Sequence, residues 1–205
     1  MKIKLVLLAV FCALGFVAFA ENTPPQYLKE LGILVGYGPA QVADKKDYCP
    51  IPVALQVGIG MDKMKLGYCD WIERLAKTFF HKDFHPAGYT EFVLEPFASY
   101  VSSPNKNAEF GLVLLSKFAY PLTPRIHPYI FAGGGIMYIT QHLHEQATQY
   151  NFTPQMGGGV SFFIKDDIAI NADWRWRHFS NAHLKNPNDG VNAKMIFVGV
   201  SKFFN

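Results

Sequence analysis

The chain has 205 residues, of which 50% are hydrophobic and 15% aromatic, with 18 Phe, 10 Tyr and 3 Trp. Its formal net charge of +3 includes Lys2 and Lys4, and without these two lysines 17 basic residues stand against 16 acidic ones. This balance argues against a large basic surface and therefore against nucleic acid as a partner. Beyond residue 21 no apolar run reaches the roughly 18 residues that a spanning helix needs, which argues against a helical membrane protein.

Residues 1–20, MKIKLVLLAVFCALGFVAFA, predict a secretory signal peptide. Lys2 and Lys4 precede an apolar run that closes on Ala18-Phe19-Ala20, the small-residue pattern of a cleavage site. A transmembrane anchor is the alternative, but the run is short for a span. We therefore expect one exported domain over residues 21–205, in which Cys49 and Cys69 are the remaining cysteines.

Residues 21–205 contain eight segments with strand character. They are 30–38, 51–61, 89–102, 109–120, 126–141, 150–164, 168–180 and 192–204. The clearest is 168–180, IAINADWRWRHFS, in which apolar and then aromatic residues at even positions alternate with Asn, Asp and Arg at odd positions. This period of two is typical of a strand with two different faces.

The same alternation would fit a soluble sandwich or an outer-membrane barrel. Along 168–180 the aliphatic residues give way to Trp174 and Trp176, as expected where a strand leaves the hydrocarbon and enters the aromatic belt. The predicted fold is therefore all-β, an antiparallel eight-stranded transmembrane β-barrel in the bacterial outer membrane. Asp173, Arg175 and Arg177 would form a charge network inside it.

Connections between the predicted strands alternate in length, as they do in outer-membrane barrels. The turns 121–124 and 165–167 are tight, whereas 103–107, 142–149 and 181–191 are longer and would face the outside. The glycine runs 133–135 and 157–159 fall inside strands and predict strong curvature.

Residues 62–88 fit the barrel least well. The segment CDWIERLAKTFF resembles a short amphipathic helix in a long inner connection. Cys49 would then lie near the outer rim and Cys69 near the inner one, separated by roughly the ~25 Å apolar band. We therefore expect no disulfide between them.

The stretch 177–192, RHFSNAHLKNPNDGVN, contains the candidate site. His178 and Ser180 lie two residues apart on one strand, so their side chains share a face, with Cα atoms roughly 6.5–7 Å apart. That spacing allows a contact between nucleophile and base on the lipid-facing side, where an ester of an outer-leaflet lipid would be the substrate. The structural alternative is a solvated strand end, followed by an Asn-Pro-Asn-Asp-Gly turn.

This stretch resembles the signature of the PagL family of outer-membrane lipid A 3-O-deacylases. The family pattern is His, an aromatic or aliphatic residue and Ser-Asn-Ala, followed by Lys and then Pro-Asn-x-Gly. The matching residues here are His178, Phe179, Ser180, Asn181, Ala182, Lys185, Pro187, Asn188 and Gly190. Weaker similarity extends over roughly 88–205, and the N-terminal third matches only loosely.

The resemblance implies an esterase that hydrolyses the 3-O-linked acyl chain of lipid A, the membrane anchor of lipopolysaccharide, without a metal or other cofactor. Ser180 would be the nucleophile and His178 its base. Asn181 and Asn188 would help to hold the oxyanion. Lys185 would meet either a lipid A phosphate or water.

The sequence departs from the family at one position. Two residues after the Gly of Pro-Asn-x-Gly, the family has a Glu that orients the His, whereas this chain has Asn192. Asn192 shares the apolar face of its strand and could fix the tautomer of His178, as in Cys-His-Asn proteases. The alternatives are that Asp189 replaces it, or that the protein is a poor catalyst.

Two other functions remain open from the sequence: a non-catalytic outer-membrane barrel, and a lipase that acts on phospholipid acyl esters. His142, His144 and Glu145 could suggest a metal site, but histidines two residues apart on an outer loop are more often solvated. The sequence leaves open whether the barrel forms a homo-oligomer.

Overall fold

The computed structural model describes residues 28–42, 45–61, 73–75, 77–78, 88–143 and 146–204. The predicted signal peptide and Cys69 lie outside these residues, and Cys49 is a half-buried free thiol. Residues 73–75 and 77–78 are helical, within the segment for which a short helix was predicted. No helix in the described part of the chain is long and apolar enough to cross a membrane.

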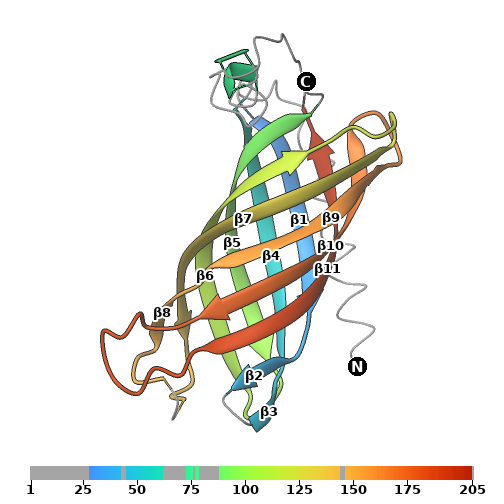
Figure 1. Ribbon diagram of the computed structural model, residues 1–205. Coiled ribbons are helices and arrows are strands. Elements are labelled where there is room, and N and C mark those ends of the chain that lie inside the picture. The colour runs from blue at the N-terminus through green and yellow to red at the C-terminus, as the bar shows by residue number, and fades with distance from the viewer. Residues whose placement is uncertain are drawn as a thin grey trace.

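Eight long strands form a closed antiparallel barrel (Figure 1). They are β1 (Leu28–Tyr37), β4 (Pro50–Gly60), β5 (Tyr89–Val101), β6 (Asn107–Ala119), β7 (Ile126–Ile139), β9 (Gln155–Phe163), β10 (Ile168–Phe179) and β11 (Val191–Phe203). Each pairs with the next, and β11 pairs with β1 to close the sheet. The eight predicted strands and the all-β barrel are therefore confirmed.

Three short strands lie at one end of the barrel. β2 (Ala40–Val42) and β3 (Lys45–Tyr48) form a hairpin that pairs with the start of β11, and β8 (Tyr150–Phe152) pairs with β7. The single strand predicted over 150–164 is thus divided into β8 and β9 at Thr153-Pro154. Pro154 lacks the N–H that a continuous ladder would need. This end also bears the loop 180–190, and we call it the site end.

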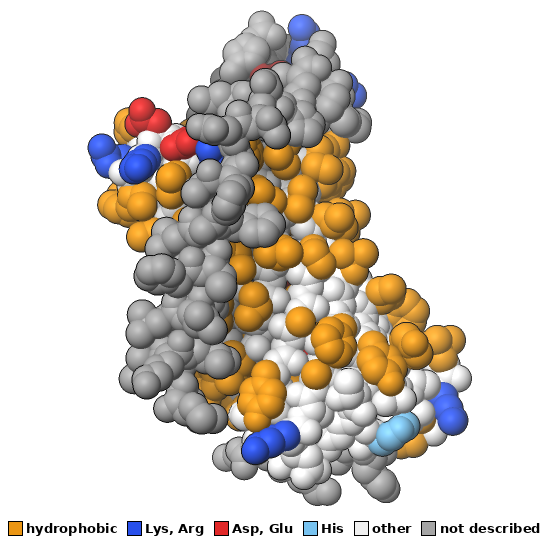
Figure 2. Space-filling model, turned by 180° about the vertical axis from the view of Figure 1, so that it is seen from behind, with side chains coloured by type: hydrophobic (Ala, Val, Ile, Leu, Met, Phe, Trp, Pro, Cys, Tyr) orange, Lys and Arg blue, Asp and Glu red, His pale blue; other side chains and the backbone are white. Residues whose placement is uncertain are grey.

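The two faces of each strand differ as the sequence predicts for a membrane barrel. On β10 the odd positions are buried, with Asp173, Arg175 and Arg177 at most 4% exposed, whereas Trp174 is 50% exposed. Hydrophobic side chains cover much of the outer wall, as Figure 2 shows, with charged side chains toward its ends. A soluble sandwich would bury this apolar face, so that alternative is wrong.

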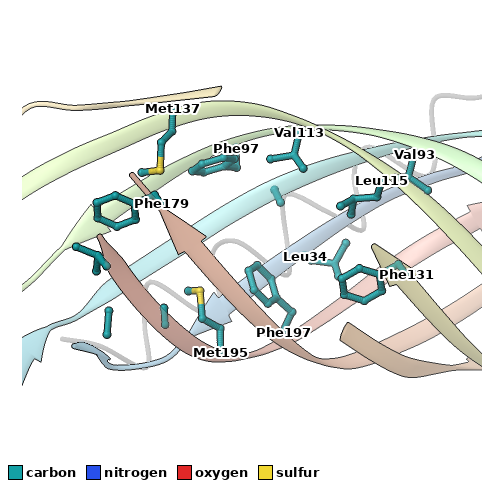
Figure 3. Close-up of a cluster of buried hydrophobic side chains, with 14 of the residues drawn as sticks. Leu34, Val93, Phe97, Val113, Leu115, Phe131, Met137, Phe179, Met195 and Phe197 are labelled. Carbon is teal, nitrogen blue, oxygen red and sulfur yellow. The ribbon is translucent and has the colours of Figure 1, made fainter. Parts of the chain in front are cut away.

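The barrel interior is filled by ion pairs and by apolar side chains packed between them. Arg177 donates two hydrogen bonds to Glu109, at 2.9 and 3.1 Å, and Arg175 pairs with Glu95 and with Asp173. Toward the other end Lys117 lies between Glu30 and Glu91. Figure 3 shows the apolar part of this interior, which includes Phe97, Phe131, Phe179, Met195 and Phe197. The predicted charge network is confirmed, but its main carboxylates come from β5 and β6.

Two glycine runs let neighbouring strands approach very closely. A Cβ at Gly135 would lie 1.9 Å from the carbonyl oxygen of Leu112, and one at Gly157 would lie 2.2 Å from that of Trp174. No side chain fits at such distances, so only glycine permits the close approach of β7 to β6 and of β9 to β10 at these residues. The glycine runs thus allow close strand packing, and the strong curvature predicted from them stays a prediction.

Candidate active site

His178 stands near the site end of β10, on the outward face of the barrel. It lies directly opposite Asn192 of β11, and its Nδ1 is 2.9 Å from Asn192 Oδ1. Because an amide oxygen can only accept, Nδ1 carries the hydrogen and donates it. That tautomer leaves Nε2 as a free acceptor, which is the form that a general base needs.

Two further residues hold the imidazole ring of His178. The ring of Trp176 stacks on it with a centroid distance of 5.9 Å and an interplanar angle of 16°. Gly190, with φ of +71°, approaches it so closely that a Cβ there would lie 2.6 Å from His178 Cε1. Glycine is thus required at residue 190 both for the backbone conformation and for the space that the ring occupies.

Ser180 lies just beyond the end of β10. Its backbone forms an isolated bridge with Phe152 of β8, with hydrogen bonds of 3.1 and 2.8 Å. This bridge continues the ladder past the strand end and therefore keeps Ser180 in the alternation that starts at His178. The described contacts of these two residues include no hydrogen bond between their side chains.

The loop 181–190 is ordered by its own asparagines. Asn188 Oδ1 accepts a hydrogen bond of 2.8 Å from the backbone N–H of Asn181. The Asn181 side chain is 1% exposed, and its Nδ2 donates to the carbonyl oxygens of Lys185 and Pro187 at 2.8 and 3.5 Å. Ala182 and His183 turn the chain with φ of 53° and 60°. Asn188 Nδ2 is left with no described partner, whereas both hydrogens of Asn181 Nδ2 are already used within the loop.

A second outer loop packs against the first. The backbone N–H of Ala147 donates to the Pro187 carbonyl at 2.9 Å, and Gln146 forms an isolated bridge with Asn188. Asn188 is therefore fixed from two sides, by Asn181 and by the loop that precedes β8. This support depends on contacts between distant parts of the sequence.

The other predicted site residues are placed differently. Lys185 and Asp189 are exposed on the loop, and Asp189 makes no described hydrogen bond or ion pair with His178. His144 and Glu145, considered as metal ligands together with His142, lie outside the described residues.

The β2–β3 hairpin, which lies beside the site, was not predicted from the sequence. Gln41 of β2 pairs with Asn192, and Tyr48 of β3 reaches into the barrel, where its hydroxyl donates to Glu109 at 2.6 Å. Burial, followed by the negative charge of Glu109, raises the pKa of Tyr48 above its ordinary value, so this hydroxyl stays protonated. Strands of three and four residues are too short for their alternation to be recognised.

The fold and the site define a class of protein. An apolar outer wall, a charged interior and a His–Asn pair beside a serine on the lipid-facing side are features of an outer-membrane β-barrel enzyme. The family model for lipid A 3-O-deacylase (PagL) matches residues 63–201. The chain therefore belongs to the PagL family, which makes it a lipid A 3-O-deacylase of the outer membrane.

Solved structures agree with this fold. The crystal structure of the outer membrane enzyme PagL is 18% identical, with a TM-score of 0.59, and the match covers 82% of this chain and 97% of that one. Neisserial surface protein A is 10% identical, with a TM-score of 0.61 and coverage of 85% and 96%. Ail of Yersinia pestis is 11% identical, with a TM-score of 0.51 and coverage of 88% and 100%. No curated protein matches the chain.

Proposed function

We propose that this outer-membrane lipid A deacylase uses Ser180 as its nucleophile and His178 as its general base. The observation that supports the proposal best is the 2.9 Å contact between His178 Nδ1 and Asn192 Oδ1. It leaves Nε2 free on the same outward face as Ser180, two residues away. A nucleophile, a base and a group that orients the base are the three parts that acyl transfer needs.

The reaction would proceed in two steps. His178 Nε2 takes the proton of Ser180 Oγ as this oxygen attacks the carbonyl carbon of the 3-O-linked acyl ester. The tetrahedral intermediate collapses to an acyl-serine, and the leaving 3-hydroxyl oxygen of the sugar receives the proton from His178. A water molecule, deprotonated in turn by His178, then releases the fatty acid and restores Ser180.

Asn188 is our candidate for the oxyanion donor. Its Oδ1 is held by the Asn181 N–H, so its Nδ2 points away from that contact and is available to donate. Asn181 supports the loop instead, because its Nδ2 hydrogens are bound to loop carbonyls. A direct oxyanion role for Asn181 stays a prediction.

The position of the site suits a substrate that lies in the outer leaflet. His178 follows Trp174 and Trp176 on the outward face of β10, at the level where an aromatic belt meets the lipid headgroups. The exposed Lys185 on the adjoining loop would bind a lipid A phosphate. If Lys185 is only solvated, its removal leaves substrate binding unchanged.

Mass spectrometry of lipid A tests the proposal. Wild type, Ser180→Ala and the control Ser116→Ala, which alters the outward face of β6, are each expressed in an outer membrane. We expect wild type and the control to release the 3-O-linked acyl chain, and Ser180→Ala to leave lipid A intact. If both folded proteins leave the 3-O-linked chain in place, a non-catalytic barrel is favoured, and if both release it, Ser180 is not the nucleophile; either result makes the proposal wrong. Lysophospholipid in the same extracts would instead identify a phospholipase.

A further inference from the structure

Lys194 is an exposed cation on the membrane-facing wall of the barrel, close to the site. It lies on the outward face of β11, two residues from Asn192 and directly opposite Trp176. Every carboxylate in the long described strands faces the interior instead: Glu30, Glu91, Glu95, Glu109 and Asp173. None of the ion pairs among the described residues includes Lys194, and an unpaired charge is unfavourable beside lipid.

The crossing from β1 to β2 runs beside Lys194, on the side of β11 that is away from Trp176. β11 pairs with β1 up to Ile196 and with β2 from Ala193, and the same register places Gly38 opposite Met195 and Pro39 opposite Lys194. A Cβ at Gly38 would lie 2.1 Å from the carbonyl oxygen of Lys194. Only a glycine can pass so close to this backbone, and the side chain of Lys194 stays exposed on the outward face between Trp176 and Pro39.

We infer that Lys194 binds a phosphate group of the lipid A molecule whose ester is cleaved. The inference rests on the proposed function for the place of the ester, next to His178 and Ser180. His178 and Lys194 are diagonal neighbours across the β10–β11 ladder, with Cα atoms about 7–8 Å apart. A lysine stem can carry its ammonium toward the headgroups, where phosphates lie.

A phosphate is the ligand whose chemistry fits this position. The lysine ammonium is a compact charge that binds phosphate without the planar geometry that arginine requires. Beside the hydrocarbon the effective dielectric constant is low, so the attraction is stronger than it would be on a water-exposed surface. Lys194 would thus act as a positioning residue that selects phosphorylated lipid and sets the depth of the ester relative to Ser180.

Binding and turnover are measured with two substrates: lipid A, and the same lipid A after its phosphates have been removed enzymatically. Both are presented in zwitterionic detergent micelles, so that the substrate supplies the only phosphomonoesters. We expect Lys194→Gln to weaken the binding of both substrates unequally. The loss of affinity for phosphorylated lipid A should be about tenfold larger than the loss for the dephosphorylated form. The change should appear more in KM than in kcat, and Lys194→Arg should restore most of it.

Two controls separate this inference from the proposed mechanism. Dissociation constants are measured in a Ser180→Ala background, so a result is obtained even if Ser180 is not the nucleophile. Lys202→Gln removes a lysine from the same face of β11 at the far end, where Lys202 lies 3.9 Å from Asp167, and should leave binding unchanged. An equal loss of binding for both substrates, or no loss for either, would overturn the role of Lys194.

Discussion

Replacing Asn192 with Asp should make the enzyme faster. Asn192 Oδ1 already receives the Nδ1 hydrogen of His178 at 2.9 Å, so Asp would supply a carboxylate oxygen at the same place. A hydrogen bond to a charged group contributes about 1.5–3 kcal/mol and a neutral one about 0.5–1.5 kcal/mol. If the difference of about 1.4 kcal/mol acts on the imidazolium formed in the transition state, kcat rises about tenfold.

Because Asn192 is exposed, the expected gain in kcat is smaller than the rate effect of the corresponding Asp-to-Asn change in a serine protease. In a serine protease the change from Asp to Asn costs about 10⁴ in rate, but that carboxylate is buried. Asn192 is exposed on the outer wall, where water and salt at the headgroup level weaken the attraction. Asn192→Ala, which removes the acceptor, should in contrast lower kcat.

The assay is the initial rate of fatty-acid release from purified lipid A in detergent, for wild type, Asn192→Asp, Asn192→Ala and Asp189→Ala. A rate for Asn192→Ala equal to that of wild type would refute the orienting role that we assign to this contact. Loss of turnover in Asp189→Ala alone would make Asp189 the third member of the set. Circular dichroism confirms that each variant retains its β structure.

Three other substitutions probe the loop, the ring contact and the interior. Asn188→Ala should lower kcat by about 10²–10³ with little change in KM, as expected for loss of an oxyanion donor, and an unchanged kcat would exclude this role. Gly190→Ala should lower kcat at least about tenfold in a folded barrel, because the new Cβ would occupy the place of the His178 ring; steady-state kinetics that match wild type would show that the ring position does not matter. Glu109→Ala leaves Arg177 buried without its carboxylate and should cost about 3–5 kcal/mol in denaturant unfolding, whereas a shift under about 1 kcal/mol would contradict the strength assigned to this pair.

The fold could be predicted because every strand of a membrane barrel carries the same local pattern of alternating residues. Lipid and interior impose opposite requirements on alternating residues, so Trp174 and Arg175 indicate their faces without knowledge of any distant partner. Pairing partners inside the barrel carry no such local signal. Arg177 binds a glutamate 68 residues earlier in the chain, and only the closed sheet determines which glutamate that is.

The candidate site was predictable as far as the strand continues. Alternation places His178 and Ser180 on the outward face, and the facing strand brings Asn192 opposite His178. Beyond Ser180 the chain follows left-handed turns at Ala182 and His183, which periodicity does not reveal. The division of roles that we propose for Asn181 and Asn188 therefore rests on the loop geometry, which the sequence does not reveal.

The alternation that identifies the strands also explains how this site can be both rigid and open to lipid. Arg177 and His178 are neighbours in sequence, yet one points into the barrel and the other out of it. The hydrogen bonds from Arg177 to Glu109, and from Tyr48 to the same carboxylate, fix the end of β10 and the β2–β3 hairpin from the inside. The imidazole that we propose as the base is thus supported from within the barrel as well as by the stacked ring of Trp176 on its own face. The interior ion pairs thus hold His178 in place, and the outer wall keeps the surface beside it free for a lipid.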